Sequence, residues 1–387
     1  MTSNSSTGEL QINAFLAERI AAGDFPSAVY LVAENGRIVF CDALGEAVRE
    51  PERHEATVET IYDLASLTKP LVTGLLSALL FERGELRLDR AVAAYLPEFA
   101  TAQTAAITVR HLLTHTSGLP AWRPLHILTG NRRERVSETI AALNLESATG
   151  TRVVYSDLGF ITLGLLLEKI SGAPLAELAQ REIFQPLGLT HTFFNPARAF
   201  LTGVAASEMA GNAYERGMYE AGEFKEKADA AGRWRENFIW GEVHDGNAYF
   251  LGGAAGHAGL FSNARETFHL AEQFIATRTR LLAPETCTLF RTNMTPALNE
   301  ARSFAWQLAA TTDSTAGNRL APDSFGHLGF TGTSCWIDST PERIFILLAN
   351  RTHTRTLPFI NINSVRRQFH ALAVAALERN KQSGEAI

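Results

Sequence analysis

The sequence predicts an α+β fold: an antiparallel sheet built from both chain ends and flanked by helices, with an α-rich domain inserted between its strands. Near the amino end, strand-like runs at 27–33 and 37–43 flank an Asn-Gly pair at 35–36, which is typical of a tight hairpin. Near the carboxyl end, residues 327–338 and 343–348 again have strand character. The chain between them is mainly helical in its apolar spacing, so the two ends must meet to complete one sheet.

Helical segments are predicted from apolar residues at helical spacing and from the Gly, Pro and Asn residues that separate them. They cover residues 10–22, 70–83, 109–114, 136–143, 158–171, 175–184 and 364–377. Residues 199–247 mix charge, glycine and aromatic side chains without periodicity, and we expect an extended loop region that shapes a substrate entrance. We divide the chain into a sheet domain, 9–95 with 266–387, and an α-rich inserted domain with cleft loops, 96–265.

Composition favours a globular protein with a small or neutral partner. The 387 residues are 46% hydrophobic, and the net charge of -6 excludes the basic surface that nucleic acid binding requires. No run approaches the roughly 18 apolar residues of a membrane span. Cys41, Cys287 and Cys335 lie far apart without a CxxC pair, so we expect buried thiols rather than disulfides or zinc ligands. The polar first residues lack the pattern of a secretory signal, which predicts a cytoplasmic protein.

The first motif with chemical meaning is Ser66-Leu67-Thr68-Lys69, which lies directly before an apolar helical run. A serine and a lysine three residues apart at a helix start share one face, so the amine can reach the hydroxyl. Because a serine hydroxyl is hardly ionised at neutral pH, a nucleophilic serine needs such a neighbour to accept its proton. The pair predicts Ser66 as nucleophile and Lys69 as its proton partner, although by itself the motif also fits a helix cap and a surface lysine.

Two later motifs strengthen this prediction. Tyr155-Ser156-Asp157 precedes a helical run and can deliver a tyrosine whose proton transfer is assisted by the Lys69 ammonium. The segment His327-Leu328-Gly329-Phe330 lies on a predicted strand, where glycine lets a substrate backbone approach the strand edge. The backbone N–H groups of Phe330 and Ser66 can then form an oxyanion hole.

In this order, the three motifs resemble those of the serine β-lactamase and penicillin-binding-protein superfamily. They are most similar to its class-C-like branch, which includes family VIII carboxylesterases and D-amino-acid peptidases. Residues 111–119 (HLLTHTSGL) and 252–262 (GGAAGHAGLFS) also match segments of that branch, so the resemblance covers nearly the whole chain. It implies a β-lactamase/transpeptidase-like fold with Ser66 acylated, Lys69 and Tyr155 carrying protons, and Ser66 and Phe330 as oxyanion donors.

The chain departs from the family pattern at two positions. Many relatives carry Asn at position 157, where it contacts the substrate acyl amide; here Asp157 is a carboxylate and a plausible partner for Lys69. The third motif of the family is Lys-Thr-Gly or His-Thr-Gly, and here Leu328 replaces the hydroxyl residue that holds a substrate carboxylate. Thr331 and Thr333 are near it in sequence. We expect His327, Leu328, Gly329 and Phe330, with Asp157, to contact the substrate.

Other sites are less well supported by the sequence. His111 and His115 have the i, i+4 spacing of metal ligands, but no HExxH is present, and we expect neither a metal nor a cofactor. Ser117 and Ser334 are rival serines outside any GxSxG motif.

The sequence therefore predicts a metal-independent serine hydrolase of the carboxylesterase or small amide and peptide hydrolase type. The alternatives are a weak β-lactamase or DD-peptidase, and a non-catalytic penicillin-binding-like sensor.

Overall fold

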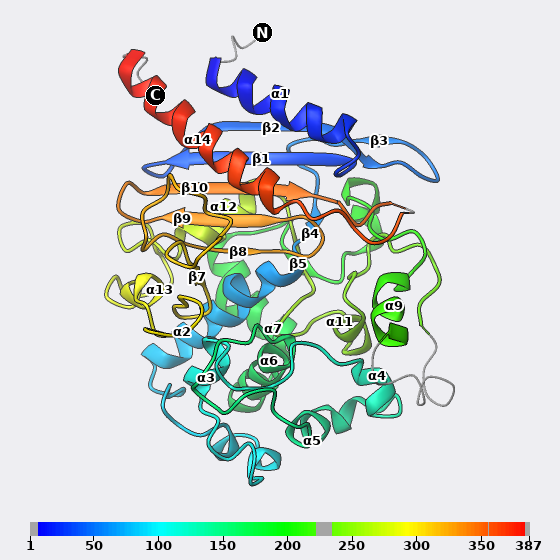
Figure 1. Ribbon diagram of the computed structural model, residues 1–387, viewed down its shortest axis with the longest axis vertical. Helices are drawn as coiled ribbons and strands as arrows, with labels where there is room; N and C mark the ends of the chain where they lie inside the picture. Colours follow the sequence, from blue (N-terminus) through cyan, green and yellow to red (C-terminus); the bar gives the residue numbers. More distant parts are fainter. Residues whose placement is uncertain (1–6, 222–233, 355, 384–387) are drawn as a thin grey trace.

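The computed structural model, which describes residues 7–221, 234–354 and 356–383, contains a seven-stranded antiparallel sheet (Figure 1). The strand order is β3-β2-β1-β10-β9-β8-β7. These strands are β1 (Ser27–Glu34), β2 (Arg37–Val48), β3 (His54–Glu55), β7 (Gln307–Leu308), β8 (Phe325–Leu328), β9 (Ser334–Asp338) and β10 (Arg343–Ala349). Strand β1 pairs with β10 along its length, so the prediction that the two chain ends share one sheet is confirmed.

The β1–β2 hairpin follows directly from its turn residues. Asn35 and Gly36 have φ angles of 52° and 72°, the left-handed values that this tight turn requires and that Asn and Gly tolerate best. The hairpin predicted from the Asn-Gly pair is confirmed.

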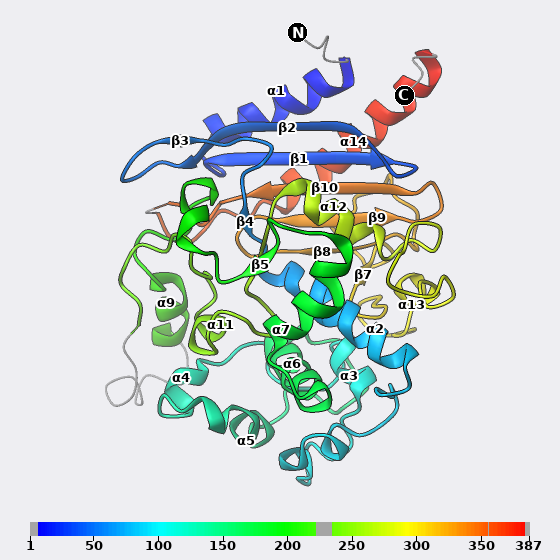
Figure 2. The same cartoon turned by 180° about the vertical axis from the view of Figure 1, so that it is seen from behind.

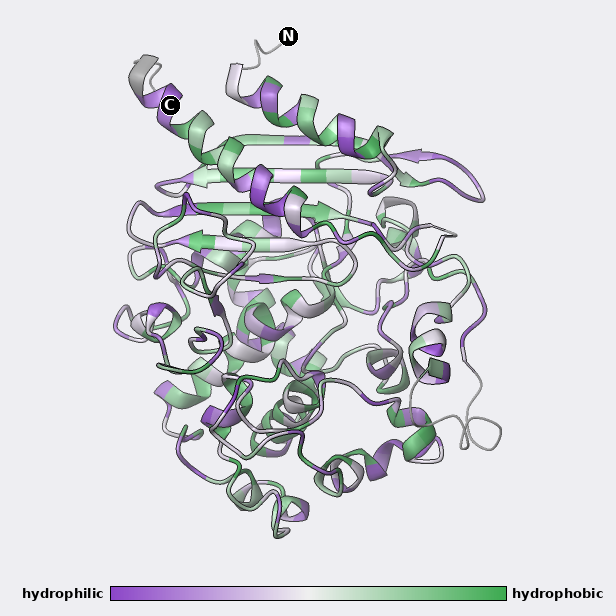
Figure 3. Ribbon diagram, viewed as in Figure 1, coloured by the Kyte–Doolittle hydropathy of each residue, from purple (hydrophilic) through white to green (hydrophobic). Residues whose placement is uncertain are grey.

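Both faces of the sheet are covered. Helices α1 (Thr7–Ala21) and α14 (Asn363–Ser383) lie across one face, and the helical layer lies against the other (Figures 1 and 2). Tyr30 and Val32 of β1 pack against α1 and α14, whereas Val29 and Leu31 belong to the larger core on the opposite face. Figure 3 shows hydrophobic and hydrophilic bands alternating along α1 and α14, as expected for helices with one buried side.

The helical layer is assembled mostly from short helices. These are α2 (Leu75–Glu82), α3 (Val109–Leu113), α4 (Leu125–Leu128), α5 (Val136–Ala141), α6 (Asp157–Ser171), α7 (Leu175–Ala179), α8 (Gln185–Leu187), α9 (Ala213–Ala221), α11 (Gly246–Phe250), α12 (Ala264–Glu272) and α13 (Thr288–Arg291). Tight 3₁₀ turns are η1 (Ala65–Leu67), η3 (Val92–Ala94), η4 (Pro97–Phe99), η5 (Arg133–Arg135) and η7 (Arg198–Gly203), and wide π-type turns are η2 (Lys69–Gly74) and η6 (Gln180–Phe184). The boundaries at 95/96 and 265/266 between the two domains stay a prediction.

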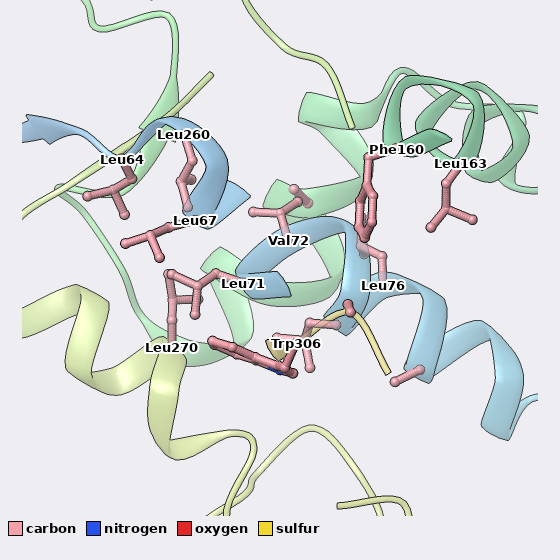
Figure 4. Packing of buried hydrophobic residues seen from close by; sticks show 14 of the residues in the cluster. Leu64, Leu67, Leu71, Val72, Leu76, Phe160, Leu163, Leu260, Leu270 and Trp306 are labelled. Carbon is pink, nitrogen blue, oxygen red and sulfur yellow. The ribbon is translucent and has the colours of Figure 1, made fainter. Parts of the chain in front are cut away.

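A second, three-stranded sheet lies between the layers and positions the first motif. Its order is β4-β6-β5, with β4 at Tyr62–Asp63, β5 at Phe193–Phe194 and β6 at Leu260–Ser262. Figure 4 shows Leu64, Leu67 and Leu71, from the segment that begins after β4, packed among Leu260, Leu270 and Trp306. The chain around Ser66 is therefore anchored by buried apolar side chains.

Two of the predicted elements are wrong. The region 199–247, predicted as an extended loop, contains η7, α9 and the start of α11, while residues 222–233 lie outside the described part. Residues 327–338 form not one strand but β8 and β9, joined by a turn. Gly332 has a φ of 121° and donates its N–H to the carbonyl of Gly329 at 3.1 Å, which reverses the chain there.

Two smaller expectations are also tested by the structure. Cys287 and Cys335 are buried as predicted, but Cys41 on β2 is half-buried. Within the described ranges, no single helix is long and apolar enough to cross a bilayer. Helix α6 and the segment Leu175–Leu187 reach that length and apolar content only when taken together, and they are bent by 73° relative to each other.

Candidate active site

Ser66 occupies a strained turn between β4 and the wide turn η2. Ala65, the residue before it, has a φ of 48°, a left-handed conformation that costs a non-glycine residue on the order of 1 kcal/mol. The Ala65 N–H donates to Asp63 Oδ1 at 2.8 Å, and the other oxygen of Asp63 accepts the N–H of His244 at 2.7 Å. This buried aspartate connects the turn that carries Ser66 to the segment before α11.

Lys69 is fully buried beside Ser66. Its Nζ donates to Ser66 Oγ at 2.8 Å and to the carbonyl of His257 at 3.0 Å. The same nitrogen lies 2.7 Å from Asp157 Oδ1. The lysine expected from the first motif and the carboxylate expected from the second are thus brought together in one ion pair beside Ser66.

The glycine-rich segment 252–262 supplies the His257 carbonyl by packing closely against α6. A Cβ at Gly256 would lie 2.0 Å from the carbonyl oxygen of Phe160 and 2.9 Å from the backbone of Gly164, so only glycine fits there. Thr73 Oγ1 donates to the Gly256 carbonyl at 2.7 Å, which fixes the adjoining peptide. The role of these glycines is close backbone packing rather than binding of a phosphate.

Tyr155 is held in place by the segment that contains His115. The Nδ1 of His115 accepts the N–H of Ser156 at 3.0 Å, and its ring lies 4.6 Å from that of Tyr155. Lys69 Nζ lies 4.9 Å from the centre of the Tyr155 ring, and Ser66 and Tyr155 line the same cavity. His115, considered above as a metal ligand, instead orients the second motif.

The charged groups in this cluster shift the pKa values of their neighbours. Burial lowers the pKa of Lys69, but the Asp157 carboxylate and Tyr155 raise it by more, so the ammonium is the resting form. Burial raises the pKa of Tyr155, the Lys69 charge lowers it and Asp157 raises it again, with a net rise. The resting site therefore holds an ammonium, a carboxylate and a neutral phenol, and the Lys69–Tyr155 pair must lose one proton before it can accept that of Ser66.

The third motif lies at the end of β8, where the edge of the sheet is open. The two-residue strand β7 pairs only with Phe325 and Gly326 of β8. The backbone of His327 and Leu328 therefore has no neighbouring strand on that side. A Cβ at Gly329 would meet Thr333 Oγ1 at 1.9 Å, so this position also needs glycine.

The backbone of the turn after β8 is suited to an oxyanion. Arg351 Nε donates to the Phe330 carbonyl at 2.6 Å and fixes the orientation of that residue. Among the described residues, the Phe330 N–H donates to no acceptor. The expected pairing of this N–H with that of Ser66 is consistent with the turn, since both residues line one cavity.

The hydroxyl groups near Leu328 cannot replace the missing one. Thr331 Oγ1 donates to the Asp63 carbonyl at 2.7 Å and Thr333 Oγ1 to the Leu64 carbonyl at 3.0 Å, so both point into the core. His327 is buried, and burial, with the charges of Lys69 and Arg302, holds its pKa well below the usual range. The third motif itself therefore offers a neutral imidazole and an apolar side chain, while the guanidinium groups of Arg351 and Arg366 bind its backbone carbonyls.

A cavity of about 370 Å³ opens onto all the predicted site residues except the buried Lys69. Sequence reasoning missed several further residues that line it, namely Trp122, Tyr214, Glu215, Met218, Arg302, Gln307 and Arg351. Tyr214, Glu215 and Met218 come from α9, inside the region predicted to be a loop. The expectation that this region shapes the substrate entrance agrees with their position, but nothing in its spacing indicated which side chains face inward.

Comparison with known proteins identifies the family. The Beta-lactamase family model matches residues 12–365. The chain belongs to this family. A putative D-alanyl-D-alanine carboxypeptidase of Escherichia coli strain K12 is 30% identical over 372 residues, covering 89% of this chain and 82% of that protein. An N-acetylmuramyl-L-alanine amidase of Bacillus subtilis strain 168 is 31% identical over 390 residues, covering 91% of this chain and 83% of that protein.

Solved structures of other proteins share the fold of this Beta-lactamase family member. EstCE1, described as a hydrolase with promiscuous acyltransferase activity, superposes with a TM-score of 0.72 at 22% identity, covering 96% of this chain and 98% of its own. A class C β-lactamase from Rhodobacter sphaeroides gives 0.70 at 20% identity, covering 96% and 100%. The predicted fold and family are confirmed, and the chain is a serine hydrolase that acts through an acyl-enzyme.

Replacing Asp157 by Asn should move the rising limb of the pH profile of kcat/KM for an ester to lower pH. The active form has lost one proton from the Lys69–Tyr155 pair, and Asp157 raises the pKa of both members. Without the carboxylate both values fall, so the proton is lost at lower pH. Steady-state rates from acidic to alkaline pH measure the limb.

The matched control for this experiment is Asp89→Asn. Asp89 is an exposed carboxylate paired with Arg110, so its loss should leave the limb in place. A limb at the same pH in wild type and Asp157→Asn would show that this carboxylate does not govern the proton-transfer pair.

Proposed function

We propose that this chain hydrolyses esters and small amides or peptides by acylation of Ser66, without a metal. The observation that supports this most strongly is the position of Lys69 Nζ, 2.8 Å from Ser66 Oγ and 2.7 Å from Asp157. A buried lysine at that distance serves a serine nucleophile, whereas a helix cap with a surface lysine would leave the amine in solvent.

Acylation begins when the Lys69–Tyr155 pair has lost one proton. Ser66 Oγ forms a bond to the substrate carbonyl carbon as its proton passes to this pair. The N–H groups of Ser66 and Phe330 donate to the oxygen that becomes negative. The bond to the leaving nitrogen or oxygen then breaks, and the pair returns the proton to that atom. Water attacks the acyl-enzyme by the same transfers and releases the acid.

The site and the relatives together support this substrate class. A putative carboxypeptidase and an amidase, whose names both denote cleavage of an amide next to an amino acid, are similar to most of this chain. An ester has a better leaving group than an amide, so the same machinery turns it over more readily. The cavity of about 370 Å³ is at the small end of the range for ligand sites, which suits a substrate of amino-acid or dipeptide size.

A weak β-lactamase or DD-peptidase is the second candidate, favoured by the name of the Escherichia coli relative. Against it stands the wall formed by the third motif, where Leu328 offers no hydroxyl to a substrate carboxylate. The cations that line the cavity here are already engaged: Arg302 donates to Glu300 Oε2 through Nε and Nη2 at 3.0 and 2.7 Å. Arg351 donates to the carbonyls of Phe330 and Ile360, and Arg366 to those of Gly329 and Thr333. A carboxylate entering here loses hydration without gaining a full set of partners.

Chelators should leave ester hydrolysis unchanged. The described residues contain no group of three or more His, Cys, Asp or Glu side chains placed to hold a metal ion. The histidines near the site are engaged instead, since His244 pairs with Glu208 and His257 with Asp245, both at 2.8 Å. Activity lost after EDTA treatment and restored by zinc would contradict the metal-free mechanism.

Short-chain esters should be hydrolysed with a higher kcat/KM than benzylpenicillin, and Leu328→Thr should narrow the difference. A desolvated anion that lacks one hydrogen bond loses about 1.5–3 kcal/mol, or roughly 10- to 100-fold in kcat/KM. A neutral ester has no carboxylate to satisfy. Steady-state rates with both substrates give the comparison.

The control is Leu328→Val, because valine has the shape of threonine without the hydroxyl. Leu328→Thr should raise kcat/KM for penicillin well above that of Leu328→Val while the ester responds equally to both. An equal response of penicillin to the two variants, or a wild type that already prefers penicillin, would refute the esterase-like assignment.

A further inference from the structure

Glu215 brings a carboxylate into the wall of the substrate cavity from α9. The residue is only 7% exposed, yet it lines the same cavity as Ser66. Its Oε1 accepts the N–H of Gly246 at 2.9 Å, and both oxygens lie close to Gly246, where a Cβ would meet Oε2 at 2.2 Å. The glycine thus leaves room for the carboxylate between α9 and the start of α11.

The other carboxylates around this site each have a partner. Asp157 pairs with Lys69 at 2.7 Å, Asp245 with His257 at 2.8 Å and Glu208 with His244 at 2.8 Å. In the described part of the chain, Glu215 forms no ion pair, and no hydrogen bond satisfies its Oε2. Glu215 is therefore the one cavity-lining carboxylate there that is engaged by neither an ion pair nor a histidine.

The charge of the nearby Arg235 favours the Glu215 carboxylate, but the Arg235 guanidinium donates its hydrogen bonds elsewhere. The guanidinium of Arg235 donates to the carbonyls of Val243 and His244 at 2.8 and 2.7 Å and to Asn212 Oδ1 at 2.8 Å. Burial, and then the neighbouring Asp245, raise the pKa of Glu215 well above the usual range. A buried carboxylate in this state gains most from a cation that enters the cavity, because its charged form is otherwise poorly compensated.

We propose that Glu215 binds a protonated amine carried by the substrate, so that this hydrolase selects acyl groups bearing an ammonium. The proposal rests on the hydrolase activity proposed above and specifies its substrate class. Aromatic and thioether side chains complete the subsite: Tyr214 and Phe330 have ring centres 5.1 Å apart, and Met218 lies on the same helix as Glu215. Such a wall packs against the methylene groups that carry the amine and attracts its charge.

Matched esters test this directly. Each amino-acyl p-nitrophenyl ester is compared with the alkanoyl ester of the same length: glycyl with propionyl, β-alanyl with butyryl, and 6-aminohexanoyl with heptanoyl. The readout is the ratio of their kcat/KM values, measured in wild type and in Glu215→Gln. The different intrinsic reactivity of the two esters cancels when the ratios of the two proteins are compared.

The expected result is a ratio lower in Glu215→Gln than in wild type by about tenfold or more for at least one chain length, as for loss of a charge-assisted hydrogen bond. The matched control is Glu220→Gln, which removes an exposed carboxylate from the same helix and should leave the ratio unchanged. An unchanged ratio in Glu215→Gln at every length would overturn the proposal and leave Glu215 only as the acceptor for Gly246. Wild type that hydrolyses neither ester would refute the hydrolase function instead.

A measurement on wild type covers the case in which Glu215→Gln does not fold. Butylammonium should inhibit hydrolysis of propionyl p-nitrophenyl ester competitively and at least about tenfold more tightly than the neutral butyronitrile of the same length. Equal inhibition by the two compounds would also overturn the proposal.

Discussion

The buried ammonium of Lys69 is the constraint on which the rest of the site depends. A charge removed from water is tolerated only when it is paired and fully hydrogen-bonded. Here the partners are Ser66, Asp157, Tyr155 and the His257 carbonyl, which come from the turn after β4, the start of α6 and the glycine-rich segment. Three distant parts of the chain must therefore meet at one nitrogen, and the small sheet and the close packing on α6 bring them there.

The same ammonium sets the charge of its surroundings. Burial and the nearby cations keep His115 and His327 neutral, so neither competes for the proton of Ser66. Asp157 holds Lys69 in its charged form, and the nucleophile turn is strained at Ala65 rather than at Ser66 itself. A site whose ammonium is paired with Asp157, and whose wall carries Glu215 without an ion pair among the described residues, is suited to substrates that are neutral at the scissile bond and positive elsewhere.

Much of this could be predicted from the sequence because it depends on local chemistry. The Asn-Gly hairpin, the sheet formed by both chain ends and the proximity of Ser66 to Lys69 all follow from spacing or turn residues. The sequence also indicates the partnership of Asp157 with Lys69, because a carboxylate stands where many relatives carry an amide. These features need no knowledge of how distant segments pack.

What could not be predicted depends on tertiary packing. Helix α9 is a short, mostly polar helix next to a stretch without periodicity, and Glu215 and Arg302 enter the cavity from segments far from any motif. Thr331 and Thr333 are near Leu328 in sequence, but the turn between β8 and β9 directs their hydroxyls toward the backbone of Asp63 and Leu64. The direction of each of these side chains is set by a contact with a residue distant in sequence. The separation is 268 residues for Thr331 and 269 for Thr333.

The central claim is that Ser66 is the nucleophile and that the buried lysine activates it. Labelling with a fluorophosphonate, followed by mass spectrometry of the digested protein, tests it most directly. We expect a single adduct on the peptide that contains Ser66, no adduct in Ser66→Ala, and labelling of Lys69→Ala slower by about a hundredfold or more, as for loss of a general base. An adduct on Ser117 or Ser334, or labelling of Lys69→Ala at the wild-type rate, would contradict the account.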